Sequence, residues 1–340
     1  MIHADLPMID LHRHLDGNVR LETILDLAQQ NNLPLPANTL EGLRPYIQVT
    51  EPLSDILSYF EKFRWMVSVF VDYDACRRVA YENVLDAESE GIDYIELRFS
   101  PIFMAQPHDL DPQGVVEAVI AGVKEGLAAT RTVKVNLLGI ISRTYGVEVG
   151  FEELEALLAF KEDIIGLDLA GDEAGYPAAW FVEHFQRARD AGWGITVHAG
   201  ESAGPESVWH AILKLGATRI GHAVRITEEP ALVDFMRENR IGIEASLTSN
   251  VHTNTVPSYA AHPLKAFLDW DLLATINTDD PGISPVTIEH EYTVAAEEAG
   301  LTPADTRKAQ KNALEIAFLS EEEKRELRNL KQKTITDPTN

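Results

Sequence analysis

The chain of 340 residues contains a single cysteine, Cys76, so no intrachain disulfide can form. Disulfide bonds persist in oxidising compartments, and their absence is typical of proteins that stay in the reducing cytoplasm. Residues 1–12 lack a basic region followed by a long apolar core, so we expect no signal peptide. The longest apolar runs, such as residues 65–71, are too short to span a bilayer. These absences predict a soluble protein of the cytoplasm.

Positive charge is also scarce, because 29 Lys and Arg residues face 54 Asp and Glu residues and leave a formal net charge of −25. A chain of this charge repels phosphate polymers and anionic membrane surfaces. We therefore expect neither nucleic acid nor a membrane as a partner, and a neutral or cationic small molecule as the substrate. Much of the charge serves solubility, and the composition does not fix an oligomeric state.

No low-complexity block or linker rich in Pro, Gly and Ser divides the chain, which predicts one domain over residues 1–333. Amphipathic stretches such as 114–130 and 151–163 alternate with β-like runs. This alternation is typical of parallel βαβ units, and eight strands close a TIM-type (β/α)₈ barrel, an α/β fold. An open doubly wound sheet would carry a Gly-rich phosphate turn after its first strand, which HRHLDGN (12–18) is not. The expected strands are 7–12, 92–100, 133–141, 164–170, 194–199, 219–224, 241–247 and 272–278.

The largest segment between two expected strands is 18–91, a helical insertion between strands one and two that would overlie the C-terminal mouth of the barrel. Within it, 56–70 is a strongly apolar helical stretch. The charged stretch 320–333 predicts a capped C-terminal helix, and residues 334–340 a disordered tail. Three aromatic side chains of the insertion are candidates for a lid over an apolar substrate, although packing in an extra helical layer explains each equally well: Tyr59, Phe60 and Phe63.

The stretch IDLHRHLDGN (9–18) places His12, His14 and Asp16 on alternate positions after an apolar run. In a β-strand such residues point to one face, so these side chains lean the same way at or just past the end of the first strand. Two imidazoles on one face can share a metal ion. Polar residues that merely close a strand would show the same pattern.

Polar segments also follow four later strands, namely AGDE (170–173), HAGE (198–201), GHA (221–223) and NTDD (277–280). The C-terminal ends of barrel strands converge on one mouth, where catalytic groups sit. Three imidazoles and a carboxylate suit Zn²⁺ or another borderline divalent ion. The predicted ligands are His12, His14, His198 and Asp279.

A metal with an open position binds water and lowers its pKa to about 7. Glu201, close to His198, is a candidate to give or take a proton beside a substrate ring, with a helix N-terminal acid as the alternative. His222 is a candidate to orient or deprotonate the water, or else a buried histidine bonded to backbone. Asp280 is free to hydrogen-bond a heterocycle. Gly171 allows close backbone approach to a ligand, or simply makes a turn.

One ion per chain is expected rather than two. Two-metal hydrolases with an HxH first strand commonly use a bridging lysine on a middle strand, whereas IIGLDLAGD (164–172) has none and Lys134 lies at the wrong end of its strand. The seven remaining histidines fall mostly on expected helices or loops, and we interpret them as surface or packing residues: His3, His108, His184, His210, His252, His262 and His290.

Taken together, eight motifs of the chain resemble those of the adenosine deaminase family, of the bacterial type, within the metallo-dependent hydrolases. The resemblance covers essentially the whole length, and the combination is far more specific than HxH alone. The motifs are HRHLDGN (12–18), ELRFSP (96–101), SRTYG (142–146), DLAGDE (168–173), TVHAGE (196–201), RIGHAV (219–224), SLTSN (246–250) and INTDDPG (276–282).

The resemblance implies hydrolytic deamination of adenosine and 2′-deoxyadenosine to inosine and deoxyinosine, with release of ammonia. It implies that Glu201 donates a proton to N1 of the purine, and that His222 positions and helps to deprotonate the attacking water. Asp280 would hydrogen-bond N7 and help to fix the hydroxide, and the Gly171 amide would reach N3. Asp16 would hold the ribose 5′-hydroxyl. It implies one zinc ion, bound by His12, His14, His198 and Asp279. His14 would also border the substrate.

Two residues depart from the family pattern: Ala223 stands where the family usually has glycine, and Ser246 where it often has cysteine. Both bear on substrate preference more than on reaction type. Rival substrates are adenine, whose deaminases tend to carry Glu in place of Asp16, and larger modified nucleosides such as aminodeoxyfutalosine. A metal-dependent amide or ester hydrolase and a catalytically silent binding protein are rival classes. HAGE (198–201), the missing mid-barrel lysine and the complete ligand set favour a deaminase.

Overall fold

The computed structural model describes residues 1–336, with side chains as far as residue 331. At its centre, eight parallel strands follow one another in sequence order. The His14 N–H donates to the Asp279 carbonyl, and the Asp279 N–H to the His12 carbonyl, both at 2.8 Å, which joins the segment after the last strand to the first. The predicted TIM-type barrel is confirmed. The strands are β1 Ile9–His14, β2 Tyr94–Phe99, β3 Lys134–Ser142, β4 Ile164–Ala170, β5 Gly194–Ala199, β6 Arg219–His222, β7 Gly242–Ala245 and β8 Leu273–Ile276.

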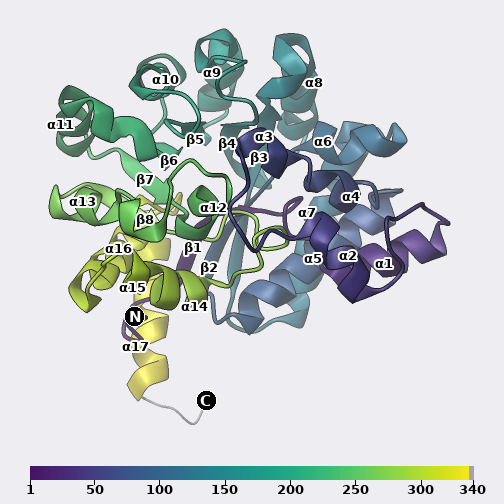
Figure 1. Ribbon diagram of the computed structural model, residues 1–340, viewed down its shortest axis with the longest axis horizontal. Helices are drawn as coiled ribbons and strands as arrows, with labels where there is room; N and C mark the ends of the chain where they lie inside the picture. Colours follow the sequence, from purple (N-terminus) through teal and green to yellow (C-terminus); the bar gives the residue numbers. More distant parts are fainter. Residues whose placement is uncertain (337–340) are drawn as a thin grey trace.

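Helices surround these strands (Figure 1). The strands are buried on both faces, which is why they read as apolar runs in the sequence. Side-chain caps fix several helix starts: Asp72 accepts the Ala75 N–H at 2.8 Å, and Thr302 and Asp305 form a capping box. The outer layer consists of α5 Tyr73–Ser89, α7 Pro112–Ala129, α8 Gly146–Leu158, α9 Val182–Asp190, α10 Pro205–His210, α11 Pro230–Glu238, α13 Leu264–Asp269 and α16 Pro303–Ile316.

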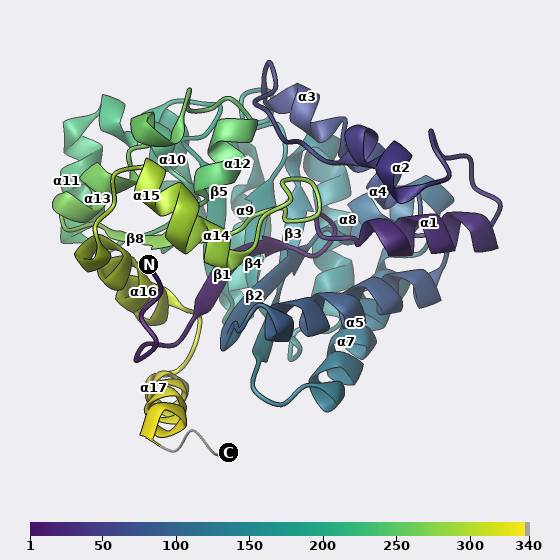
Figure 2. The ribbon, with the colours of Figure 1, turned by 60° about the horizontal axis from the view of Figure 1, so that its bottom comes forward.

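The segment 56–70, expected as one helical stretch, is two short helices. At their junction the Lys62 N–H bonds the Tyr59 carbonyl at 3.0 Å, so the chain tightens into a turn instead of continuing as an α-helix. Figure 2 shows this part of the insertion over one end of the barrel. Besides α5, the insertion 18–91 contains α1 Leu21–Gln30, α2 Leu40–Ile47, α3 Ile56–Phe60 and α4 Phe63–Val67.

Four further helices are short. They are α6 Pro101–Ala105 after β2, α12 Leu247–His252 after β7, and α14 Ile288–His290 and α15 Ala296–Glu298 after β8. The last helix, α17 Glu321–Thr336, projects from the opposite end of the barrel (Figure 2) and runs past its expected end at residue 333. The rest of the predicted tail, 337–340, lies outside the described residues.

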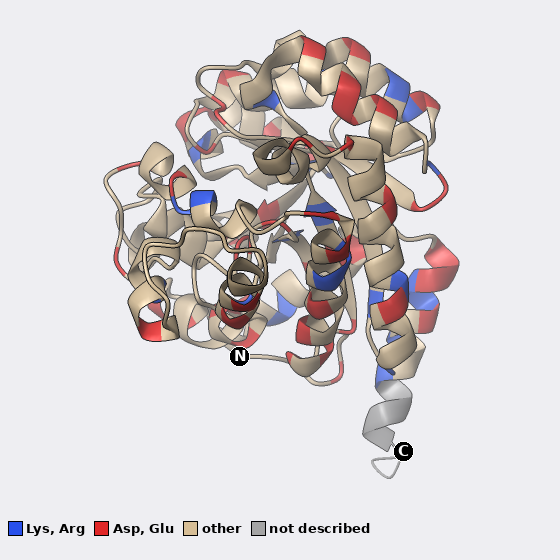
Figure 3. Ribbon diagram, turned by 90° about the vertical axis from the view of Figure 1, so that its right-hand side faces the viewer, with Lys and Arg blue, Asp and Glu red and all other residues tan. Residues whose placement is uncertain are grey.

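Acidic residues are spread over the outer helices, with fewer basic residues among them (Figure 3). This distribution matches the net charge of −25. None of the helices within residues 1–336 combines the length and the apolar character that a membrane crossing requires.

Candidate metal and catalytic site

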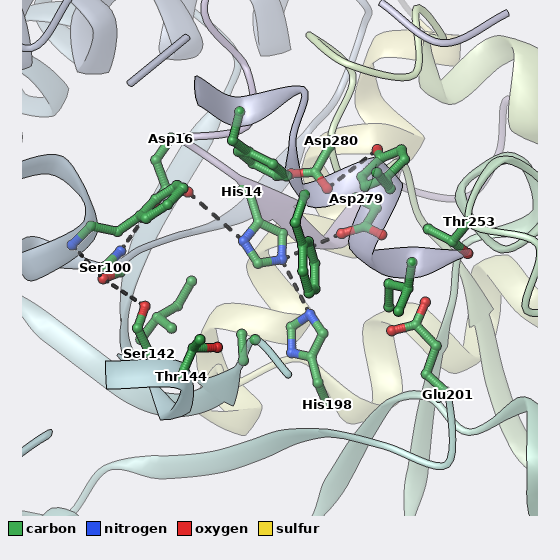
Figure 4. Close-up of a pocket in the computed structure, with 18 of the residues that line it drawn as sticks. His14, Asp16, Ser100, Ser142, Thr144, His198, Glu201, Thr253, Asp279 and Asp280 are labelled. Carbon is green, nitrogen blue, oxygen red and sulfur yellow. Dashed lines mark hydrogen bonds and ion pairs between the residues drawn. The ribbon is translucent and has the colours of Figure 1, made fainter. Parts of the chain in front are cut away.

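The four predicted metal ligands meet at the mouth of the barrel, although they come from β1, β5 and the segment after β8. The Nε2 atom of His198 lies 3.1 Å from Nε2 of His12 and 3.2 Å from Nε2 of His14. The Oδ1 atom of Asp279 lies 3.3 Å from the same atoms of His12 and His14. All four residues are buried. In Figure 4, His14, His198 and Asp279 point toward one another.

The protons of two of these rings are fixed by acceptors behind them. His12 Nδ1 lies 2.7 Å from Glu244 Oε2, and His198 Nδ1 lies 2.9 Å from Asp168 Oδ2. Each Nδ1 therefore carries the proton, and each Nε2 turns a bare lone pair toward the centre. Asp279 adds a carboxylate there. Burial alone would raise its pKa, but the nearby imidazoles lower it well below the usual value.

Lone pairs crowded in this way need a cation between them. Four of the six distances between the ligand atoms are 3.1–3.3 Å, and all six are within 4.8 Å. Such distances leave room for an ion with Zn–N and Zn–O bonds of roughly 2.0–2.2 Å. A histidine that donates its other N–H to a carboxylate is the usual form of a metal-ligating histidine. The residues therefore fit one divalent ion such as zinc.

Sequence reasoning missed the charged residues that support this site from within the strands. Arg98 on β2 donates to Asp168 on β4 and to Glu244 on β7, both at 2.7 Å. Arg219 on β6 lies 2.5 Å from Glu96 and 2.7 Å from Glu244. All five side chains are buried. Their signal was present as charged letters inside apolar strand runs, such as IELRFS and GIEASL.

A cavity with an empty volume of about 950 Å³, counted out to its open mouth, adjoins the ligands. Glu201, Asp280 and His222 line one side of it, and the candidate lid residue Tyr59 lines another. Burial, followed by the charges of Asp279 and Glu173, raises the pKa of Glu201 well above its usual value. Burial and Asp279 do the same for Asp280, and burial lowers the pKa of His222. Each of these shifts favours the uncharged form of its group.

The lid candidates do face this cavity. Ile56, Tyr59, Phe60 and Phe63 contribute apolar lining from the insertion. The Tyr59 hydroxyl lies 3.1 Å from Ser284 Oγ and donates to Asp280 Oδ2 at 3.4 Å. The insertion therefore lines the cavity and also bonds to one of the candidate catalytic groups.

Asp16 lies at the other end of the cavity, beside Ser100 and Ser142 (Figure 4). Its Oδ2 accepts the Ser100 N–H at 3.0 Å, and burial raises its pKa to about 7. Gly171 lines the same cavity with φ +106°, and a Cβ there would lie 2.5 Å from Thr144 Oγ1. Both its backbone conformation and the close approach of Thr144 require glycine.

Glu173, another residue that the sequence did not single out, holds the loop that carries Glu201. Its Oε1 accepts the Gly200 N–H at 2.6 Å, and its Oε2 accepts the N–H groups of Ser202 and Ala203, both at 2.8 Å. One carboxylate thus satisfies successive backbone donors just after β5. The motif DLAGDE contained this residue, but only its glycine was assigned a role.

Two further residues lie behind His222. Asn250 Nδ2 is 3.0 Å from His222 Nδ1 and 3.1 Å from Glu201 Oε1. His262 Nε2 is 3.1 Å from Asn250 Oδ1. The sequence offered SLTSN as a motif without a role for Asn250, and His262 was interpreted as a surface or packing residue; it is 4% exposed.

The two departures from the family pattern are both buried. Ala223 has φ 55° and follows His222 at φ 64°, so the chain turns through the left-handed region as β6 ends. This turn explains why β6 stops at His222 rather than at the expected residue 224. Ser246 precedes α12, and its hydroxyl makes no hydrogen bond within the described residues.

Comparison with known proteins identifies the family. The family model described as adenosine deaminase matches residues 7–334. The chain belongs to the adenosine deaminase family. It is thus a hydrolase of that family, as the motifs indicated.

Relatives match over nearly their full lengths. The adenosine deaminase of Serratia proteamaculans (strain 568) is 57% identical over 329 residues, which cover 97% of this chain and 99% of the relative. That of Klebsiella pneumoniae (strain 342) is 58% identical over 324 residues, or 95% and 97% of the two chains. The crystal structure of adenine deaminase from Arthrobacter aurescens is similar with a TM-score of 0.87 at 23% identity, covering 97% of this chain and 99% of that one. This last likeness supports the barrel fold.

Proposed function

We propose that the protein catalyses zinc-dependent hydrolytic deamination of adenosine and 2′-deoxyadenosine to inosine and deoxyinosine. One observation carries the proposal: a set of lone pairs that fits a divalent ion lies beside the same cavity as the buried carboxyl group of Glu201, whose pKa is raised well above its usual value. Membership of the family and the relatives named adenosine deaminase support the purine substrate. His12, His14, His198 and Asp279 would hold the zinc ion.

The reaction needs a nucleophile at C6 of the purine and a proton at N1. A bound zinc ion supplies Lewis acidity, which lowers the pKa of water to about 7. Glu201 gives its proton to N1 as hydroxide adds to C6, so the ring loses its resistance to attack and no anion develops on it. The exocyclic nitrogen then takes the proton that the attacking water has given up and leaves as ammonia. The C6 hydroxyl returns a proton to Glu201, and its oxygen remains as the carbonyl oxygen of inosine.

The other cavity residues bind and orient the purine. A protonated Asp280 can donate to N7, and the Gly171 amide to N3, both of which are acceptors on adenine. His222 faces the nucleophile from the side of Glu201. Asp16 accepts the ribose 5′-hydroxyl, and its developing negative charge near neutral pH opposes a 5′-phosphate. Nucleosides should therefore be preferred to nucleotides and to the free base.

The test is an ultraviolet absorbance assay of the purified protein with adenosine, deoxyadenosine, adenine and adenosine 5′-monophosphate, with metal content measured on the same sample. Rapid loss of the adenosine spectrum, with about one zinc per chain and slow turnover of the monophosphate, is the expected result. Equal turnover of adenosine and its monophosphate would refute the role of Asp16. A filled metal site without adenosine turnover would point to another 6-aminopurine, such as adenine or a modified nucleoside.

A further inference from the structure

A chain of hydrogen bonds runs from the backbone of α13 to two of the candidate catalytic groups. The Leu264 N–H donates to His262 Nδ1 at 3.1 Å, and His262 Nε2 lies 3.1 Å from Asn250 Oδ1. Asn250 Nδ2 then reaches His222 Nδ1 at 3.0 Å and Glu201 Oε1 at 3.1 Å. The four side chains are buried, with exposures of 0–8%.

The first bond fixes the direction of all the others. A backbone N–H can only donate, so His262 accepts at Nδ1 and carries its proton on Nε2. That proton makes Asn250 Oδ1 the acceptor, because the opposite amide orientation would set the NH₂ group against an N–H group. The two amide protons of Asn250 therefore point at His222 Nδ1 and at Glu201 Oε1, and both of those atoms are acceptors.

We propose that Asn250 and His262 are positioning residues that hold the proton of His222 on Nε2, on the cavity side of the ring, and the proton of Glu201 on Oε2. The inference rests on the proposed deaminase function. In that reaction His222 donates a hydrogen bond to the oxygen that attacks C6, and so orients it. His222 does not act as its base, because a base needs a bare Nε2 and hence an Nδ1–H directed at the Asn250 NH₂ group.

The same hydrogen bonds also orient the carboxyl group of Glu201. Glu201 Oε1 is occupied by an amide proton, so the carboxylic proton sits on the other oxygen and is available to the purine ring. One asparagine side chain thus fixes both the ring tautomer of His222 and the orientation of the Glu201 carboxyl group. It does so from behind, because neither Asn250 nor His262 is among the cavity-lining residues.

The helix that carries Asn250 is itself anchored. Glu291, buried on the segment after α14, accepts the N–H of Leu247 at 3.1 Å and that of Thr248 at 3.3 Å. These are the first N–H groups of α12, which have no partner within the helix. Asn250 therefore projects from a fixed helix end, as a positioning group requires.

The proton positions can be read directly by NMR of the zinc-loaded protein labelled with ¹⁵N in histidine, where two-bond couplings distinguish an Nε2–H from an Nδ1–H ring. His222→Gln identifies the signal of His222. We expect Nε2–H in the wild type. In Asn250→Asp, a carboxylate replaces the amide and accepts from the ring, so the proton should move to Nδ1.

Kinetics then separate positioning from packing. Asn250→Asp should lower kcat on the order of 10³–10⁴-fold, the loss seen when a catalytic histidine is held in the wrong tautomer, with little change in KM for adenosine. His262→Phe removes the donor to Asn250 and should cost on the order of tenfold, whereas His262→Gln keeps a donor and should restore most of that loss. The matched control is His184→Phe, a buried histidine bonded to the Val147 carbonyl at 2.9 Å on the outer layer; it should leave kcat and the His222 signal unchanged.

Two results would overturn the inference: an Nδ1–H ring at His222 in the wild type, or Asn250→Asp with kcat within about threefold of wild type. A folding failure of a variant leaves the wild-type spectrum decisive. If the wild type shows the Nε2–H ring but does not deaminate adenosine, the tautomer stands and the proposed function fails. The two conclusions are therefore tested separately.

Discussion

Replacing Glu244 with glutamine tests whether buried charge in the strands supports the metal site. The carboxylate is fully buried and meets only donors. Its Oε2 accepts from His12 Nδ1 and Arg98 Nη2, both at 2.7 Å, and its Oε1 accepts from the Thr196 hydroxyl at 2.8 Å. Glutamine has the same shape, but its NH₂ group must face one of these donors. The change also removes a counter-charge from Arg98 and Arg219.

Two effects of this substitution can be measured apart. Removing one partner of a buried charged cluster costs about 3–5 kcal/mol, which urea unfolding of the metal-free protein at pH 7 would show. Loss of the acceptor behind a ligating histidine lowers metal affinity about 10–100-fold, which competition with a chromogenic chelator would show. The control is Glu315→Gln, the same change at an exposed pair with Arg240, where about 1 kcal/mol or less is expected.

The stability effect should depend on pH with a definite sign. Burial alone would raise the pKa of Glu244, but Arg98 and Arg219 lower it well below the usual value. A carboxyl group of this kind contributes stability above its unfolded pKa of about 4.3 and loses it as the pH falls toward the folded pKa. The difference between wild type and Glu244→Gln should therefore be largest at neutral pH and shrink below about pH 4. An unchanged urea midpoint together with unchanged metal affinity at pH 7 would refute the reasoning.

Three other substitutions test single residues. Glu201→Gln should retain metal and ligand but lose about 10²–10⁴-fold in kcat, the usual contribution of a general acid; near-normal turnover would remove Glu201 from that role. Asp279→Ala should lose the metal or bind it loosely, and full zinc content after gel filtration would contradict its assignment as a ligand. Ala223→Gly should raise the free energy of unfolding by up to about 1 kcal/mol, because residue 223 has φ 55°. A lower urea midpoint would count against that explanation.

The strands and the histidines at their ends could be predicted because both follow from the topology of a closed parallel barrel. Parallel strands buried on both faces read as continuous apolar runs, and a closed barrel brings all their C-terminal ends to one mouth. The predicted strand ends were wrong where the local backbone conformation determines the last paired residue. β1 continues to His14 because its pairing with β2 persists to Arg98, and β6 ends early at the left-handed residues 222 and 223.

The supporting residues could not be predicted, because their partners are distant in sequence. Glu244 bonds His12 across 232 positions and Arg98 across 146. A single charged residue in an apolar run indicates a buried ionic group, but it does not identify the residue with which that group pairs. His262 gave even less signal, since its role depends on a backbone N–H of α13 and on an asparagine from another helix.

The buried ions below the site follow from what the metal ligands require. His12 and His198 each have a carboxylate acceptor for the Nδ1 proton, and an ionised acceptor at that depth needs a cation. Arg98 satisfies both demands at once, because it bonds Asp168 and Glu244 together. Glu201 and Asp280 instead bond an amide and a phenol, and burial raises the pKa of each well above its usual value. Contact with a guanidinium group therefore separates two kinds of buried carboxyl group. Asp168 and Glu244 have lowered pKa values and orient metal ligands, whereas Glu201 and Asp280 have raised pKa values and face the cavity.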